Sequence, residues 1–155
     1  MPEPDSSRVY LDDASLLLLA SGDERKQALL ARLLDHVKQD GQVFTSAAAL
    51  ATVQEFFLAR NGAPRLRQYW NGLDGLFREI LPLRGEDLGR ALDLVEYMRL
   101  PENPPDSGSG TKPSRSPLDS ARALHAAIAL NHGIDSMVDP LNCYGDIPGI
   151  KAFEF

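Results

Sequence analysis

Hydrophobic positions along the chain fall into two patterns. Short apolar or β-branched runs predict strands, and apolar residues three or four positions apart predict helices. The predicted strands are 9–11, 42–45, 80–83 and 136–138, with 147–151 as a candidate edge strand. The predicted helices are 15–20, 24–40, 47–61, 64–77, 86–98 and 117–132. Strands that alternate with helices predict an α/β fold, a three-layer α/β/α sandwich with a central parallel sheet of four to five strands.

Capping residues and prolines set the expected limits of these elements. Asp23 and Ser46 are predicted N-caps, and Gly133 is a predicted helix stop. The last helix is expected to begin at Ser116, with Pro117 in its first turn. Proline cannot donate to a strand ladder, so Pro82 is predicted to lie on an edge strand or at the end of a strand. In the helix 86–98, four residues are expected to face the core: Leu88, Ala91, Leu92 and Val95.

The pattern predicts one domain, residues 8–153. Residues 1–7 are polar and contain prolines, so we expect a flexible N-terminal tail. The stretch 101–117 is rich in proline, glycine and serine, which predicts a mobile internal loop and not a domain boundary.

Charge and cysteine content narrow the classes of function. The 155 residues carry a net charge of -6, which argues against a strongly basic surface for nucleic acid. The single cysteine, Cys143, has no internal partner for a disulfide, which fits a reducing compartment. Its sequence context does not suggest a nucleophile. No run approaches the roughly 20 apolar residues that span a bilayer. A cytoplasmic protein without a membrane contact is expected.

The first predicted strand ends at two carboxylates, Asp12 and Asp13, before an apolar helix begins. Ligands of open α/β sheets bind at the carboxyl ends of the strands, so these acids lie where chemistry is expected. Asp13 is preferred as the site residue, with Asp12 as a solvated neighbour, although the register leaves the choice between them open. A phosphoacceptor receiver domain also carries such an acidic pair. That class needs an acceptor aspartate and a late lysine, whereas here Thr45 and Leu83 end the inner strands.

Three segments, in this order, resemble the PIN domain family, especially the toxin-type (VapC-like) members of bacterial toxin–antitoxin pairs. The first is Asp13-Ala14-Ser15-Leu16-Leu17, and the second is Gln54-Glu55-Phe56. The third is the end of the chain, which contains Ala123-Leu124-His125-Ala126-Ala127, Gly133-Ile134-Asp135 and Ile147-Pro148-Gly149-Ile150. The resemblance runs from about Val9 to Phe153. It implies a divalent-metal-dependent endoribonuclease that hydrolyses RNA by metal-activated water, with a small antitoxin as partner. A homodimer is expected on the same ground.

The resemblance also implies a set of site residues. Asp13 and Glu55 would hold Mg²⁺ or Mn²⁺ and activate water. Asp139 stands where the family usually has Ser or Thr, and we expect it as a further ligand and catalytic residue in place of a lost carboxylate. Ser15 would support Asp13 or the start of the helix by hydrogen bonding. His125 is expected to be a packed or hydrogen-bonded helix residue.

Two of the family's four acid positions carry other residues in this chain, Arg122 and Leu141. Asp119 lies one helical turn before Arg122, and either Asp119 or Asp139 would partly replace a lost carboxylate. We favour an ion pair of Arg122 with Asp13 or Glu55 that replaces the metal; the other interpretation is a contact with an RNA phosphate. The alternative function is therefore a catalytically degenerate PIN-like module that binds RNA or protein.

Overall fold

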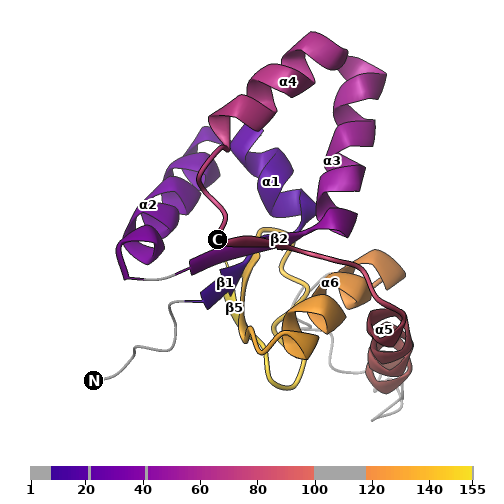
Figure 1. Cartoon of the computed structure of the whole chain (residues 1–155). Helices are drawn as coiled ribbons and strands as arrows, with labels where there is room; N and C mark the ends of the chain where they lie inside the picture. Colours follow the sequence, from indigo (N-terminus) through magenta and orange to yellow (C-terminus); the bar gives the residue numbers. More distant parts are fainter. Residues whose placement is uncertain (1–7, 21, 41, 100–117, 155) are drawn as a thin grey trace, which may run out of the picture.

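A computed structural model describes residues 8–20, 22–40, 42–99 and 118–154 (Figure 1). Five parallel strands form one sheet in the order β3-β2-β1-β4-β5, which confirms the predicted parallel sheet. The strands are β1 (Arg8–Tyr10), β2 (Gln42–Ser46), β3 (Glu79–Leu81), β4 (Ser136–Asp139) and β5 (Lys151–Glu154). The helices are α1 (Asp13–Ala20), α2 (Glu24–Asp40), α3 (Ala47–Arg60), α4 (Ala63–Gly72), α5 (Gly85–Arg99) and α6 (Ser120–Asn131). The predicted tail 1–7 and loop 101–117 lie outside the described residues.

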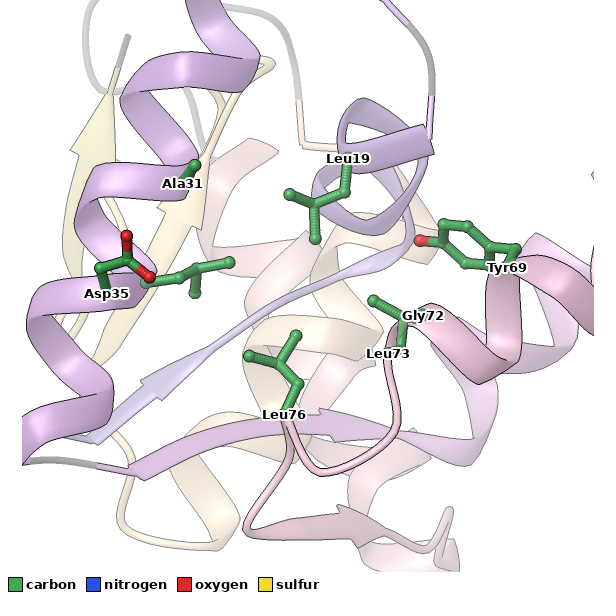
Figure 2. Close-up of a pocket in the computed structure, with 8 residues that line it drawn as sticks. Leu19, Ala31, Asp35, Tyr69, Gly72, Leu73 and Leu76 are labelled. Carbon is green, nitrogen blue, oxygen red and sulfur yellow. The ribbon is translucent and has the colours of Figure 1, made fainter.

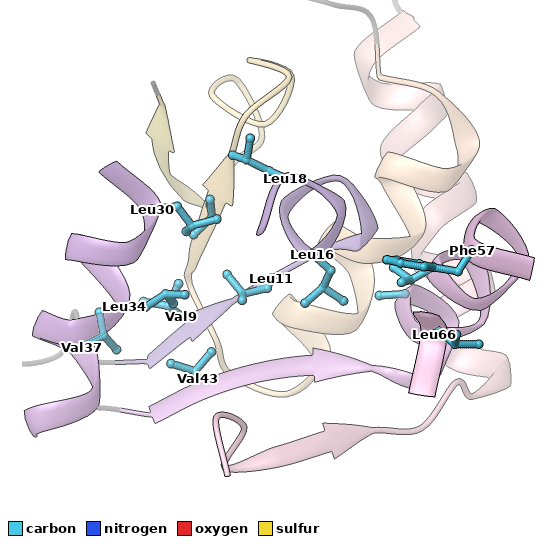
Figure 3. Packing of buried hydrophobic residues seen from close by; sticks show 13 residues of the cluster. Val9, Leu11, Leu16, Leu18, Leu30, Leu34, Val37, Val43, Phe57 and Leu66 are labelled. Atoms are coloured by element: carbon cyan, nitrogen blue, oxygen red, sulfur yellow. The ribbon is translucent and has the colours of Figure 1, made fainter. Parts of the chain in front are cut away.

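Helices cover both faces of the sheet, with α1 to α4 on one side and α5 and α6 on the other (Figure 1). The central strand β1 shows why both faces are apolar. Val9 packs into the cluster below α1 to α4, whereas Tyr10 packs into the cluster against α6. Figure 3 shows the first cluster, to which α1 contributes Leu16 and Leu18, α2 contributes Leu30 and Leu34, and α3 contributes Phe57. Burial on both faces is typical of parallel sheets and gives continuous apolar runs.

The strand register brings three segments to one edge of the sheet. Tyr10 lies beside Phe44 of β2 and beside Met137 of β4. The hydroxyl of Thr45 donates to the carbonyl oxygen of Leu11 at 2.8 Å and extends the β1–β2 pairing beyond the strand. The residues that follow β1, β2 and β4 therefore meet at the carboxyl edge, where the candidate acids were expected.

The predicted N-caps of two helices are present. Asp23 accepts the backbone N–H groups of Arg25 and Lys26 at 2.8 and 3.2 Å, and α2 begins at the next residue. Ser46 accepts the N–H of Ala49 at 3.1 Å and caps α3. Gly133, with a φ of 71°, ends the turn after α6 as predicted.

The largest differences from the predicted element boundaries occur at three places. The last helix begins at Ser120, and Asp119 is its N-cap in place of Ser116. α4 ends at Gly72 and not at residue 77, in keeping with the low helix propensity of glycine. The candidate edge strand lies at Lys151–Glu154, beyond the predicted 147–151, while β3 does lie at the other edge.

The predicted core face of α5 is partly wrong. Ala91 is buried, but Leu88 and Leu92 are 51% and 66% exposed. Asp87 is fully buried instead: it accepts the N–H of Arg84 at 2.8 Å and the side-chain amide of Asn131 at 2.7 Å. Among the described residues, no helix is both long and apolar enough to cross a membrane.

Candidate functional site

The acid pair lies where β1 gives way to α1. Asp12 follows the strand and is 1% exposed, contrary to the expectation of a solvated side chain. Its Oδ1 accepts the backbone N–H of Ser15 at 2.9 Å and the Ser15 hydroxyl at 3.0 Å. This is the hydrogen bonding of an N-cap, so the start of α1 holds Asp12 rigidly. Ser15 therefore supports Asp12 and the helix start. Asp13, the first residue of α1, is also buried.

Arg122 reaches from α6 to both acids. Its Nη1 lies 2.7 Å from Asp12 Oδ2, and its Nη2 donates to Asp13 Oδ1. The guanidinium thus joins two buried carboxylates through its two outer nitrogens. The predicted ion pair with Asp13 is present, and a second pair with Asp12 accompanies it.

Arg122 owes its position to the first turn of α6. Its backbone N–H donates to the capping carboxylate of Asp119 at 2.8 Å, and its Nε lies 3.8 Å from the same oxygen. Burial lowers the pKa of Arg122, but the charges of Asp12 and Asp13 outweigh burial and raise it. The guanidinium is therefore charged at any ordinary pH.

Tyr144 is a member of the cluster that sequence reasoning missed. Its hydroxyl donates to Asp12 Oδ2 at 2.5 Å. Burial, and next the charge of Asp12, raise the pKa of Tyr144 well above its ordinary value, so the phenol keeps its proton and remains a donor. Tyr144 follows β4 in an irregular turn, and no motif in the sequence marks it as a site residue.

His125 joins the cluster from the next turn of α6 and is 3% exposed, as expected for a packed or hydrogen-bonded residue. Its Nε2 lies 3.1 Å from Asp13 Oδ1, and its Nδ1 lies 2.8 Å from the Tyr10 hydroxyl. Tyr10 also contacts the Ser46 hydroxyl at 2.7 Å. The chain of contacts therefore runs from the acid pair across β1 to the cap of α3.

The electrostatics of Asp13 follow from these neighbours. Burial raises the pKa of Asp13, but the hydrogen bond from His125 and the charge of Arg122 together outweigh burial and lower the pKa to about 2. Asp13 is therefore ionised at neutral pH, with one guanidinium for two carboxylates in the cluster.

Asp139 ends β4 beside this cluster and is 1% exposed. Its two oxygens accept the backbone N–H groups of Cys143 at 2.9 Å and Tyr144 at 3.0 Å. Asp139 therefore organises the turn that carries Tyr144. Burial, and next the charge of Asp139, raise the pKa of Cys143 to about 12, so the thiol is a poor nucleophile.

The remaining predicted residues are exposed. Glu55 is exposed on α3 and forms no ion pair with another described residue. Leu141 is 49% exposed, and the side chain of Asp119 is 68% exposed. Within the described ranges, no three His, Cys, Asp or Glu side chains are grouped so that they could hold a metal ion.

The donor set does not fit Mg²⁺ or Mn²⁺ in this arrangement. Arg122 already contacts both members of the acid pair, and both oxygens of Asp139 are bound to backbone N–H groups. These ions prefer several oxygen ligands around one centre. The site is therefore a partly neutralised acid cluster, built of two carboxylates, one guanidinium and hydrogen-bond donors.

No protein-family model matches the chain, and no curated protein matches it by sequence. Several solved structures are similar to it, and three of them are described below. One is VapBC2 from Rickettsia felis bound to a DNA fragment from their promoter, with 11% identity, 95% of this chain and 98% of that chain covered, and a TM-score of 0.69. A toxin–antitoxin complex from Klebsiella pneumoniae shows 19% identity, coverage of 95% and 99%, and a TM-score of 0.59. Mycobacterium tuberculosis VapC20, described as a sarcin–ricin loop cleaving toxin, shows 15% identity, coverage of 83% and 86%, and a TM-score of 0.54. The chain has a PIN-domain, VapC-like fold.

Proposed function

We propose that this chain is the PIN-fold member of a toxin–antitoxin pair and that it works by binding an antitoxin-type protein, as a catalytically degenerate module. The observation that carries this proposal is an apolar groove of about 370 Å³ between α1, α2 and α4 (Figure 2). Its lining consists of Leu19, Ala31, Leu34, Asp35, Tyr69, Gly72, Leu73 and Leu76. An amphipathic helix that lays its apolar face into such a groove is a common mode of recognition.

Contacts of Tyr69 hold one side of the groove in place, and Asp35 supplies a negative charge on the other side. Tyr69 donates its hydroxyl to the carbonyl oxygen of Leu16 and stacks on Phe57 with ring centroids 4.9 Å apart, which ties α4 to α1 and α3. Asp35 is exposed on α2 at the opposite wall (Figure 2). The occupant expected from this lining is a helix with leucine-like side chains on one face and a lysine or arginine at its edge.

The comparisons support a partner of this kind. The similar structure from Klebsiella pneumoniae is described as a toxin–antitoxin complex, and that from Rickettsia felis as VapBC2. Each likeness covers 95% of this chain.

The test is first a search for a short reading frame beside the gene that encodes an antitoxin-type protein, and then binding of that protein to this chain, measured by calorimetry and by light scattering after size exclusion. Leu73→Glu and Leu76→Glu place a charge in the groove and are expected to abolish the complex. Leu92→Glu is the matched control, because Leu92 is exposed on α5, outside the groove. Groove variants that bind as well as the wild type would overturn the proposal. The same light-scattering run tests the expected homodimer.

The second candidate is a metal-dependent endoribonuclease with RNA as substrate. It is favoured by the placement of Asp12 and Asp13 at the carboxyl edge of the sheet and by the likeness to VapC20, a sarcin–ricin loop cleaving toxin. Asp13, Glu55 and Asp139 are its proposed catalytic and metal-binding residues. The test is RNA cleavage with Mg²⁺ or Mn²⁺, with a chelator as control. Cleavage that Asp13→Ala abolishes would establish this candidate in place of the non-cleaving one.

A further inference from the structure

A buried cation lies between the carboxylates of two consecutive residues. Asp12, Asp13 and Arg122 are 1%, 8% and 6% exposed, so water screens their charges weakly. Two neighbouring buried carboxylates repel each other unless a cation compensates them. The guanidinium of Arg122 is that cation, with one outer nitrogen directed to each acid.

The acceptor capacity of Asp12 is fully used. A carboxylate offers about four lone-pair positions. Ser15 fills two of them through its N–H and hydroxyl, and Arg122 and Tyr144 fill the other two. A metal ion between the acids would therefore have to displace Arg122.

The helix alone does not favour a cation at position 122. Arg122 is the third residue of α6, close to the partial positive charge of the helix N-terminus, where acidic side chains are stabilised and basic ones are not. Its contacts with Asp12 and Asp13 compensate for this position. The positive charge of Arg122 is therefore stabilised by Asp12 and Asp13 and not by the dipole of α6.

We propose that Arg122 is a resident cation that occupies the place of a metal ion between Asp12 and Asp13, and that shortening its side chain opens this place to a guest cation. The guests that fit are Mn²⁺, which carboxylates bind, and free guanidinium, which restores the lost group. The inference rests on the acid cluster and is independent of the partner groove.

The experiment compares the full chain with Arg122→Ala. Mn²⁺ binding is followed by calorimetry and by the electron paramagnetic resonance of the free ion, and thermal unfolding is measured with millimolar guanidinium chloride against sodium chloride. We expect the wild type to respond to neither guest, and Arg122→Ala to bind Mn²⁺ and to gain thermal stability with guanidinium. Arg90→Ala is the matched control, since Arg90 is exposed and bonds to Asn131 at 2.8 Å, away from the acids.

Further variants test whether the added cation binds at the acid pair, and provide a second measurement if Arg122→Ala does not fold. The double variant Asp12→Asn with Arg122→Ala should bind Mn²⁺ roughly tenfold or more weakly than Arg122→Ala, because a carboxylate ligand is lost. If Arg122→Ala does not fold alone, guanidinium should promote its refolding, and the neutral Arg122→Gln is titrated in its place. The proposal is overturned if the wild type binds Mn²⁺ as tightly as the variants, or if neither variant gains cation binding. Both readouts are independent of antitoxin binding, so this proposal and the proposed function fail separately.

Discussion

The hydroxyl of Tyr144 donates a hydrogen bond to Asp12 at the carboxyl edge of the sheet. Tyr144 lies in a turn and not in a helix or strand. The turn is built by Asp139, which accepts the backbone N–H groups of Cys143 and Tyr144. Asn142, within the same turn, has a φ of 57°. An aspartate predicted as a metal ligand therefore has a visible structural role, because it aims a tyrosine at the acid pair.

Removing Asp139 should destabilise the fold. Asp139→Ala leaves two buried backbone N–H groups without their acceptor, and each such group costs about 1–3 kcal/mol. We expect a loss of about 2 kcal/mol or more in the free energy of unfolding, measured by urea denaturation. Asp93→Ala, at an exposed position of α5, is the control. A loss below about 0.5 kcal/mol, the range of ordinary surface changes, would contradict this role.

Tyr144→Phe should cost about 1.5–3 kcal/mol of stability, the range for a hydrogen bond to a charged group. The ring stays buried, so the change isolates the hydroxyl. Thermal unfolding measures the effect, and Tyr97→Phe, at an exposed tyrosine, is the comparison. In a double-mutant cycle with Asp12→Asn, the two losses should add to more than the loss of the double variant. Strict additivity would show that the hydroxyl does not act through Asp12.

Acid sensitivity should arise in part from Asp13. Its folded-state pKa is lowered from 3.8 to about 2, so its contribution is fully present above pH 3.8 and is lost as the pH falls toward about 2. The shift corresponds to about 2 kcal/mol, at 1.36 kcal/mol for each pKa unit. We expect Asp13→Asn to flatten the fall of stability between about pH 4 and 2, as measured by urea titrations at each pH. Glu55→Gln is the control, since Glu55 is exposed; an equal flattening in that variant would exclude Asp13 as the source.

Asp119 should act as a cap and not as a metal ligand. Asp119→Ala removes the acceptor of the Arg122 N–H and should cost about 1 kcal/mol. Asp119→Ser retains a capping oxygen and should recover most of that loss. Thermal unfolding with and without Mn²⁺ is the measurement, and the metal should change neither result. A Mn²⁺ response that Asp119→Ala removes would instead support a ligand role.

Features that depend on nearby residues were predictable. The caps Asp23 and Ser46 were found from the sequence because each bonds to N–H groups two or three residues ahead. The core face of α5 was predicted only in part: Ala91 is buried and Val95 packs against the core, but helical periodicity alone cannot show which side of a helix has a neighbour. Leu88 and Leu92 match the period of a buried stripe, yet both are exposed.

The sequence by itself determined the order of strands and helices, the parallel sheet and the meeting of acids at its carboxyl edge, since hydrophobic period and capping are local properties. The resemblance also pointed to an ion pair of Arg122 with Asp13 or Glu55, and the pair with Asp13 is present. Only the tertiary structure decided that Asp12 shares the guanidinium and that Tyr144, 132 residues away, completes its shell. The physical reason is that a buried carboxylate takes its donors from whatever elements pack around it, and that packing brings together residues far apart in the chain.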